Sequence, residues 1–115
     1  DLYVRVTIAK HPLYERQGDN LIQTLPVDLY TAVLGGKAEV STFTGKVKIS
    51  IPPGTQNGKI LRLKRKGMPV YGQHNEFGDM LVKIQVKIPE RLTPEEKELF
   101  ERLRTLAVKK TTSYA

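Results

Sequence analysis

Residues that could perform acid–base, nucleophilic or metal chemistry are sparse in this sequence. The two histidines, His11 and His74, are far apart in segments rich in turn-forming residues, and the chain contains no cysteine. A metal centre needs several ligands at short, regular spacing, and a nucleophile needs a neighbouring base. Neither pattern is present, and the glycine-rich segments match neither the phosphate-binding loop nor the dinucleotide fingerprint. We therefore expect no catalytic residue, no metal, no cofactor and no enzymatic activity.

The sequence has an excess of positive charge, which says more about possible binding partners than the sparse catalytic residue types do. The chain has 19 Lys and Arg against 12 Asp and Glu, a net charge of +7. Six basic residues occupy the polar positions of three predicted strands: Lys46, Lys48, Arg62, Lys64, Lys83 and Lys87. If these strands share one sheet, its outer face is a cationic panel that could bind DNA through its phosphates. The alternative is that lysines keep the sheet soluble, and the lack of interleaved aromatic side chains favours it.

Alternating strands must hold these residues. Apolar side chains at every second position predict strands over residues 2–8, 21–27, 38–43, 47–51, 60–64 and 80–88. Residues 11–20 predict a loop, Pro26 ends its strand or places it at a sheet edge, and Pro52-Pro53-Gly54 turns the chain. Asp28 as a cap and Gly35 as a stop predict a short helix over residues 28–34. The chain is therefore mainly β.

The C-terminal segment predicts an amphipathic helix. Thr93 can cap it, Pro94 suits its first position, and Glu96 follows the cap by three residues. Leu99, Leu103 and Leu106 then share one stripe, with Phe100 beside it, and the acidic residues suit the first turn and the solvent face. We expect the helix to occupy residues 92–108 and a flexible tail to follow over 109–115.

The N-terminal strand echoes a later one. Residues 1–8 resemble residues 79–86 in polar and apolar order, so we expect residues 1–9 to be the last strand of a preceding, truncated subdomain. The chain does not begin with Met, which also indicates a fragment. No apolar run is long enough to span a bilayer, so no membrane partner is expected. The absence of cysteine suits a reducing compartment, and we expect the cytoplasm, or the nucleoid if DNA is bound.

Five segments, in order along the chain, resemble the second C-terminal subdomain of DnaJ-type co-chaperones. They are HPLYERQGDNL at 11–21, AVLGG at 32–36, IPPGTQNG at 51–58, LRLKRKGMP at 61–69 and GDMLV at 78–82. The resemblance covers residues 1 to about 108. It is strongest to the bacterial curved-DNA-binding subgroup, which lacks the zinc region of its relatives.

The resemblance implies a fold and a function. The fold is a small two-sheet β-sandwich over residues 10–91 with one short helix, followed by the C-terminal helix. The function is that of a J-domain co-chaperone, which binds unfolded client proteins and delivers them to a DnaK-type ATPase chaperone. The J domain itself is separate, and His11-Pro12-Leu13 is not its His-Pro-Asp signature.

The resemblance also implies homodimerisation through the C-terminal helix. The candidate contacts are Leu99, Phe100, Leu103 and Leu106. An isolated helix of this length is marginal in water, so its apolar stripe needs a surface to cover. The alternative is that the stripe packs on its own sandwich, and both hold if Leu99 and Leu103 turn inward while Phe100 or Leu106 faces a partner.

A client-binding groove is implied by analogy with the first subdomain of the family. It would lie between the strand that ends at Pro26 and the strand over 38–43, with Leu25 and Val40 as client contacts. Gln23 and Thr42 also face this place, and their polarity does not suit a groove that needs apolar walls.

Overall fold

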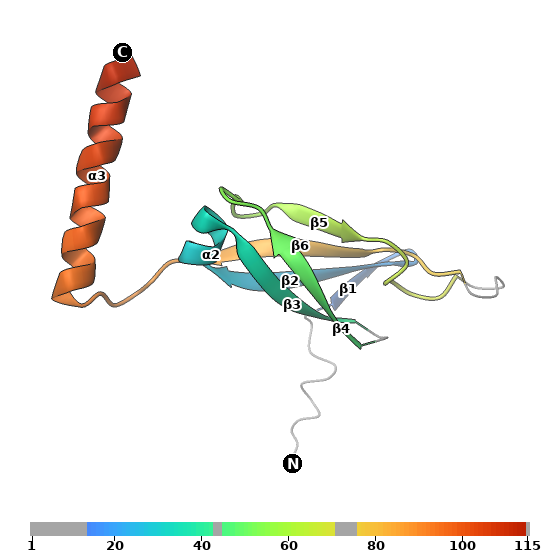
Figure 1. The fold of residues 1–115 in the computed structure, drawn as a ribbon. Helices are drawn as coiled ribbons and strands as arrows, with labels where there is room; N and C mark the ends of the chain where they lie inside the picture. The colour runs from blue at the N-terminus through green and yellow to red at the C-terminus, as the bar shows by residue number, and fades with distance from the viewer. Residues whose placement is uncertain (1–13, 43–44, 71–75, 115) are drawn as a thin grey trace.

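The computed structural model describes residues 14–42, 45–70 and 76–114 of the chain. These residues form a six-stranded, two-sheet sandwich with one short helix, from which a long C-terminal helix projects (Figure 1). The elements are β1 (Tyr14–Gln17), β2 (Asn20–Asp28), α2 (Leu29–Leu34), β3 (Gly36–Thr42), β4 (Gly45–Ile51), β5 (Ile60–Leu63), β6 (Met80–Lys87) and α3 (Pro94–Tyr114). The predicted fold class, a mainly β sandwich with a short helix and a C-terminal helix, is confirmed. The predicted strand over residues 2–8 and both histidines lie outside the described residues.

The larger sheet has the order β1-β2-β6-β5. Strands β2 and β6 are parallel and pair from Leu21 opposite Met80 to Asp28 opposite Lys87, whereas the other two pairings are antiparallel. Pro26 lies in the central strand β2, but β1 pairs only with residues 20–23, so none of the described residues pairs with Pro26 from that side. A proline lacks the N–H that a neighbouring strand would need, which explains its place there.

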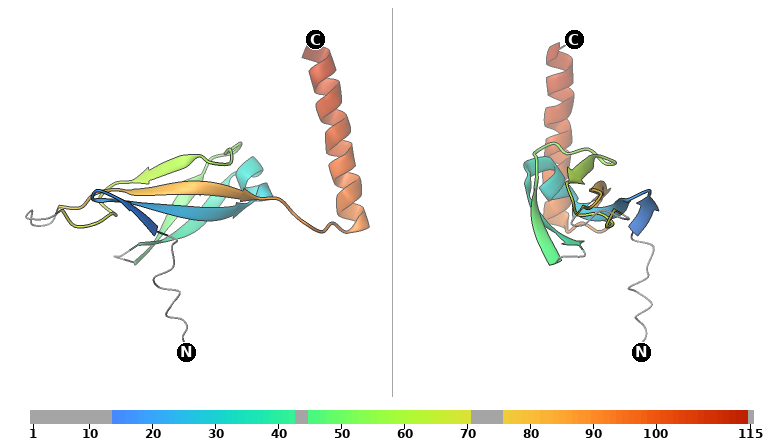
Figure 2. Two further views of the ribbon diagram at one scale, coloured as in Figure 1. Left: turned by 180° about the vertical axis from the view of Figure 1, so that it is seen from behind. Right: turned by 90° about the vertical axis from the view of Figure 1, so that its right-hand side faces the viewer.

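The smaller sheet is the β3-β4 hairpin, which packs across the larger one (Figure 2). Because side chains alternate along each strand, one face of each sheet turns inward and fills the core. The core residues are Leu21, Val27, Ala32, Val40, Ile49, Ile51, Met80, Val82 and Ile84. Among the described residues Gln23 is the one buried polar residue, and its amide donates a hydrogen bond of 3.0 Å to the Ser41 carbonyl of the other sheet. The two sheets are therefore joined by an apolar core and a polar bridge.

The residues on either side of helix α2, Asp28 and Gly35, determine where it begins and ends. The Asp28 carboxylate accepts a hydrogen bond of 2.8 Å from the Thr31 N–H, as an N-cap should. At the other end Gly35 has φ +86°, and a Cβ there would meet the Pro53 ring at 3.0 Å. Only glycine combines that backbone angle with such a close approach. The chain thus turns within one residue from α2 into β3.

Two predictions about element boundaries were wrong. Residues 11–20 do not form only a loop, because Tyr14–Gln17 is strand β1, paired with β2 through a turn at Gly18 and Asp19. The residues of β1, Tyr-Glu-Arg-Gln, do not alternate between polar and apolar, so the sequence pattern did not predict this strand. Helix α3 does not end near Val108 but continues to Tyr114, so residues 109–114 are not a tail. No glycine or proline follows Val108, and lysines suit the C-terminal part of a helix.

Candidate functional site

Exposed apolar side chains gather at one end of the molecule. Of the ten large hydrophobic residues that are exposed in the described part of the chain, all except Ile60 belong to α2, α3 or the linker between β6 and α3. They are Tyr30, Val33, Leu34, Ile88, Leu92, Leu99, Leu103, Leu106 and Val108. Such clustering is typical of surfaces that bind another molecule, whereas single exposed hydrophobic residues are ordinary.

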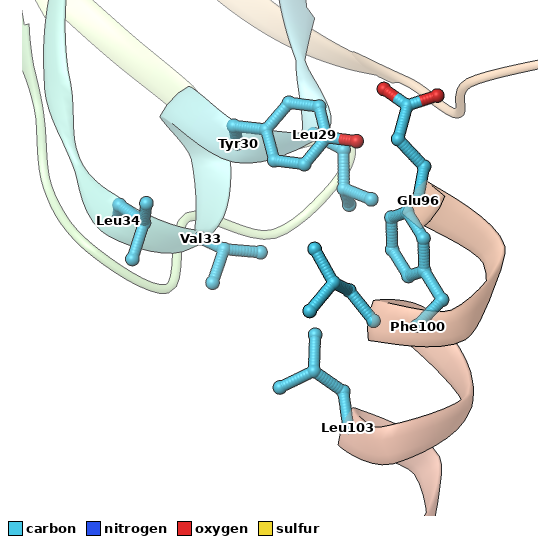
Figure 3. Close-up of a pocket in the computed structure, with 8 residues that line it drawn as sticks. Leu29, Tyr30, Val33, Leu34, Glu96, Phe100 and Leu103 are labelled. Atoms are coloured by element: carbon cyan, nitrogen blue, oxygen red, sulfur yellow. The ribbon is translucent and has the colours of Figure 1, made fainter. Parts of the chain in front are cut away.

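An apolar groove lies between α2 and the first half of α3 (Figure 3). It has a volume of about 450 Å³ and is lined by Leu29, Tyr30, Val33, Leu34, Glu96, Leu99, Phe100 and Leu103. The rings of Tyr30 and Phe100 lie 6.3 Å apart and are tilted by 45°, a favourable aromatic contact that joins α3 to the sandwich. The two helices touch but do not close on one another, since Leu99 stays 52% and Leu103 58% exposed.

Local structure fixes the position of α3 along the chain. The Thr93 N–H donates to Glu96 Oε1 at 2.8 Å, and the Glu96 N–H donates to Thr93 Oγ1 at 3.1 Å. These two bonds are the reciprocal capping box that the sequence predicted. Beyond the first turns the helix leaves the sandwich and projects from it (Figure 1). Its second half therefore carries Leu106, which is 59% exposed, away from its own sandwich.

The structure brings the four predicted dimerisation residues onto this surface. Leu99, Phe100 and Leu103 line the groove, and Leu106 continues the same stripe one turn further along α3. The sequence did not reveal the opposite wall, which α2 supplies through Leu29, Tyr30, Val33 and Leu34. The sequence did carry a signal, because five of the six residues of this short helix (LYTAVL) are apolar or aromatic, which is more than one buried face can hold. In the structure only Ala32 is buried. Whether a second copy covers the stripe stays a prediction.

The predicted cationic panel requires three strands in one sheet, and the structure does not place them so. Strand β4, with Lys46 and Lys48, belongs to the smaller sheet, whereas Arg62, Lys83 and Lys87 lie on the larger one, with Lys64 just after β5. Alternation alone could not show this separation, because it encodes which face is buried and not which strands pair. The outer faces of the two sheets point away from one another, so the six residues form two separate groups.

Acidic neighbours reduce the positive charge of both groups. Lys46 lies 3.8 Å from the Glu39 carboxylate on the adjacent strand, and Arg62 forms an ion pair with Asp79. Lys87 stands opposite Asp28 in the β2-β6 pairing. The structure thus gives Lys46 and Arg62 acidic partners within the fold as well as a surface position.

The two predicted client-binding residues belong to the sandwich interior. Val40 is fully buried in the core, and Leu25 is partly buried against it. Strands β2 and β3 lie in different sheets, and the side chains of Gln23 and Tyr14 both donate to the Ser41 carbonyl between them. A client would have to part the sheets to reach Val40. Client binding by these residues stays a prediction, and their evident contribution is to packing.

Two carboxylates in the described residues have lowered pKa values. The Arg65 N–H, at 3.0 Å, and the Arg62 guanidinium both donate to Asp79, and they lower its pKa below its ordinary value. The backbone and hydroxyl of Thr31 do the same to the pKa of Asp28 at the start of α2. Both carboxylates hold neighbouring segments of the fold in place through these hydrogen bonds. Across the described residues there is no cluster of three or more His, Asp or Glu that could hold a metal ion, and no helix long and apolar enough to cross a membrane.

Comparison with known proteins assigns the chain to a family. The family model described as the DnaJ C terminal domain matches residues 1–89. The chain is 44% identical over 101 residues to the chaperone protein DnaJ of Opitutus terrae, covering 88% of this chain and 26% of that protein. It is 43% identical over 104 residues to the chaperone protein DnaJ 2 of Synechocystis, covering 90% of this chain and 33% of that protein.

The chain therefore spans about a quarter to a third of the length of these curated relatives. The matched family model covers both sheets and α2, and it ends before α3 begins. From the sequence match and the sandwich architecture together, the chain belongs to the DnaJ C-terminal domain family.

Proposed function

We propose that this chain is a dimerising, client-binding part of a J-domain co-chaperone. In this role it holds unfolded client proteins without covalent chemistry and supports their delivery to a DnaK-type ATPase chaperone. The observation that carries the proposal is the apolar end of the molecule, where nine exposed hydrophobic side chains gather and five of them line the α2–α3 groove. The relatives named DnaJ chaperone supply the functional class. The cytoplasm is the compartment we propose for this function.

Homodimerisation is the first part of the proposal. The leucines of the α3 stripe are more than half exposed. Their exposure to water is unfavourable by about 25 cal/mol for each Å² of apolar surface that stays uncovered. A second copy offers the same stripe and the same groove, as a two-fold interface requires. Two client-binding units then act on one substrate, which raises the effective affinity without any new contact.

Light scattering tests the dimer. The full chain should have the mass of two copies, and a variant that lacks residues from Leu92 onward should have the mass of one. Leu103→Asp and Leu106→Asp together should give the same result, because each places a charge in the apolar stripe. Thr105→Asp, at a position between them on the opposite side of the helix, is the control and should remain dimeric. A full chain that stays monomeric at high micromolar concentration would refute this part.

Client binding is tested with a permanently unfolded model protein. The full chain should slow its aggregation, and the truncated monomer should do so less well at equal mass concentration because it lacks avidity. The effect should persist in 0.5 M salt, since apolar contacts are not screened. Protection that disappears on adding salt would contradict apolar client capture.

DNA binding is a second candidate function, favoured by the net charge of +7 and by basic side chains on the outer faces of both sheets. It would fit the curved-DNA-binding subgroup. Binding through phosphates must weaken steeply as salt rises, because counterions are released. The variants Lys46→Gln with Lys48→Gln, and Arg62→Gln with Lys83→Gln, separate the two sheet faces. DNA retention that survives both pairs together would exclude these residues as the DNA site.

A further inference from the structure

Opposite charges divide helix α3 into two halves. Residues 95–101 contain four glutamates and one lysine, a net charge of −3, whereas residues 102–110 contain four basic residues and no acid, a net charge of +4. The basic residues of the second half are Arg102, Arg104, Lys109 and Lys110. Acids near the N-terminus and bases near the C-terminus also suit the helix dipole. The dipole alone, however, does not explain a separation that continues through the middle turns.

We propose that the α3 helices of two copies pack against one another in antiparallel orientation, centred on Leu103. This inference rests on the proposed homodimer and adds the orientation of its helices. The occupant of the exposed stripe is thus the same stripe of a second copy. A parallel pair would place two acidic halves side by side and two basic halves side by side, which is unfavourable. An antiparallel pair places each acidic half beside a basic one.

The spacing of the stripe agrees with this centre. When Leu103 of one copy faces Leu103 of the other, Leu99 is level with the partner's Ala107, and Phe100 is level with the partner's Leu106. At the ends of the stripe, Glu96 is level with the partner's Lys110. Apolar side chains thus meet apolar ones over the central two turns, and opposite charges meet outside them. Positions 96, 99, 103, 106 and 110 fall on one face of a helix with 3.6 residues per turn.

The flank of the stripe repeats the pattern. Glu95 and Lys109 lie on the same side of the stripe, about four turns apart. In antiparallel helices the same flanks face each other, so Glu95 approaches the partner's Lys109 twice in a symmetric dimer. The groove beside α2 has room for part of the incoming helix, since it is apolar and about 450 Å³ in volume.

Cross-linking distinguishes the two orientations cleanly because the natural chain has no cysteine. Glu95→Cys and Lys110→Cys are prepared separately in the full chain, one of them isotope-labelled, then mixed, allowed to exchange subunits and treated with a short bis-maleimide. In the antiparallel pair these two positions lie within about one residue's rise of each other, whereas the two copies of position 95 are about 24 Å apart. We expect mixed cross-links between the two variants and few within either one.

The outcomes separate this inference from the dimer itself. Cross-links within each variant and none between them would establish a parallel pair and overturn the inference, as would a dimer that gives neither product. A monomeric mass before cross-linking would overturn the dimer as well. Lys48→Cys, on β4 and away from α3, is the control and should give no cross-link.

Charge reversal gives a second, independent readout. Glu95→Lys and Lys109→Glu should each weaken the dimer by roughly tenfold at low salt, because an attraction that occurs twice becomes a repulsion. The double variant should recover most of that loss. Lys97→Glu, away from the stripe, serves as the control. Failure of the double variant to recover would contradict the antiparallel pairing.

Discussion

Asp79 connects three segments at the end of the sandwich remote from α2, two of them through its carboxylate and one through its backbone N–H. Its side chain accepts from Arg62 on β5 and from the N–H of Arg65, while its own N–H donates to Asn20 Oδ1 at 2.7 Å. Arg65 has φ +64°, an unfavourable backbone angle for a residue other than glycine. The hydrogen bond from its N–H to Asp79 holds it in that conformation.

The lowered pKa of Asp79 predicts a dependence of stability on pH. A carboxylate whose pKa is lowered in the folded state stabilises the fold fully above its ordinary pKa of about 3.8, and this stabilisation is lost as the pH falls below that value and through the lower pKa of the folded state. Asp79→Asn should therefore melt at a lower temperature than the natural chain at pH 7, with the difference shrinking toward pH 3. Thermal unfolding followed by circular dichroism checks this. Glu90→Gln, an exposed carboxylate of the linker, should show no such trend, and a constant difference would contradict the ionic role.

Gly78 shows a steric requirement at the same end of the molecule. A Cβ at this position would lie 2.2 Å from the Asp19 carbonyl oxygen, which no side chain can tolerate. The close approach allows the loop before β6 to pack on the β1-β2 turn, where the Met68 N–H donates to the Asp19 carbonyl at 2.8 Å. From the sequence alone, this glycine indicates only a loop between two strands.

Among the elements, α3 has the strongest local specification. Its capping box satisfies backbone groups at the first turn, and the helix, 21 residues long in all, has little support from the sandwich. A helix in that position gains its stability from its ends, its side-chain pairs and whatever covers its apolar stripe.

The cap therefore predicts a measurable loss. Thr93→Ala should reduce the stability of the helix by about 1 kcal/mol, because the Glu96 N–H loses its acceptor. Helical circular dichroism should fall, and dimerisation should weaken with it if α3 is the interface. Thr105→Ala removes a hydroxyl that bonds within the helix to the Glu101 carbonyl, and it should be neutral or slightly stabilising. Equal effects of the two substitutions would show that the capping box does not matter.

Considered as a whole, the molecule is a small sandwich whose two sheets depend on one shared core. Strand β4 illustrates the division, since Ile51 is 2% exposed and faces the larger sheet, whereas Lys48 lies on the outer face. The projecting helix adds no residue to the buried core. Stability of the sandwich and association through α3 are therefore separable properties.

Substitutions on the two faces of β4 test this. Ile51→Ala should lower the free energy of unfolding by about 2–5 kcal/mol, because it leaves a cavity between the sheets. Lys48→Ala, on the opposite face, should change it by less than about 0.5 kcal/mol. Urea unfolding followed by tyrosine fluorescence gives both values. Similar losses from the two variants would mean that β4 does not pack with one face inward.

The sequence by itself determined the features that depend on neighbours along the chain. Alternation located β2 to β6 and their buried faces, Asp28 and Thr93 marked the two helix starts, and the leucine spacing identified the stripe of α3. These features follow from period and capping, which act over a few residues. The short strand β1 and the last turns of α3 were missed because their residues carry no such signal.

Only the tertiary structure decided what each face meets. It placed the β3-β4 hairpin in a sheet separate from β5 and β6, which divided the basic residues between two sheets, and it enclosed Val40 in the core. It also brought α2 against α3 and so created a groove whose walls are more than 60 positions apart in sequence. The physical reason is that an apolar face requires burial without specifying its partner, so the choice among partners is made by the packing of the entire chain.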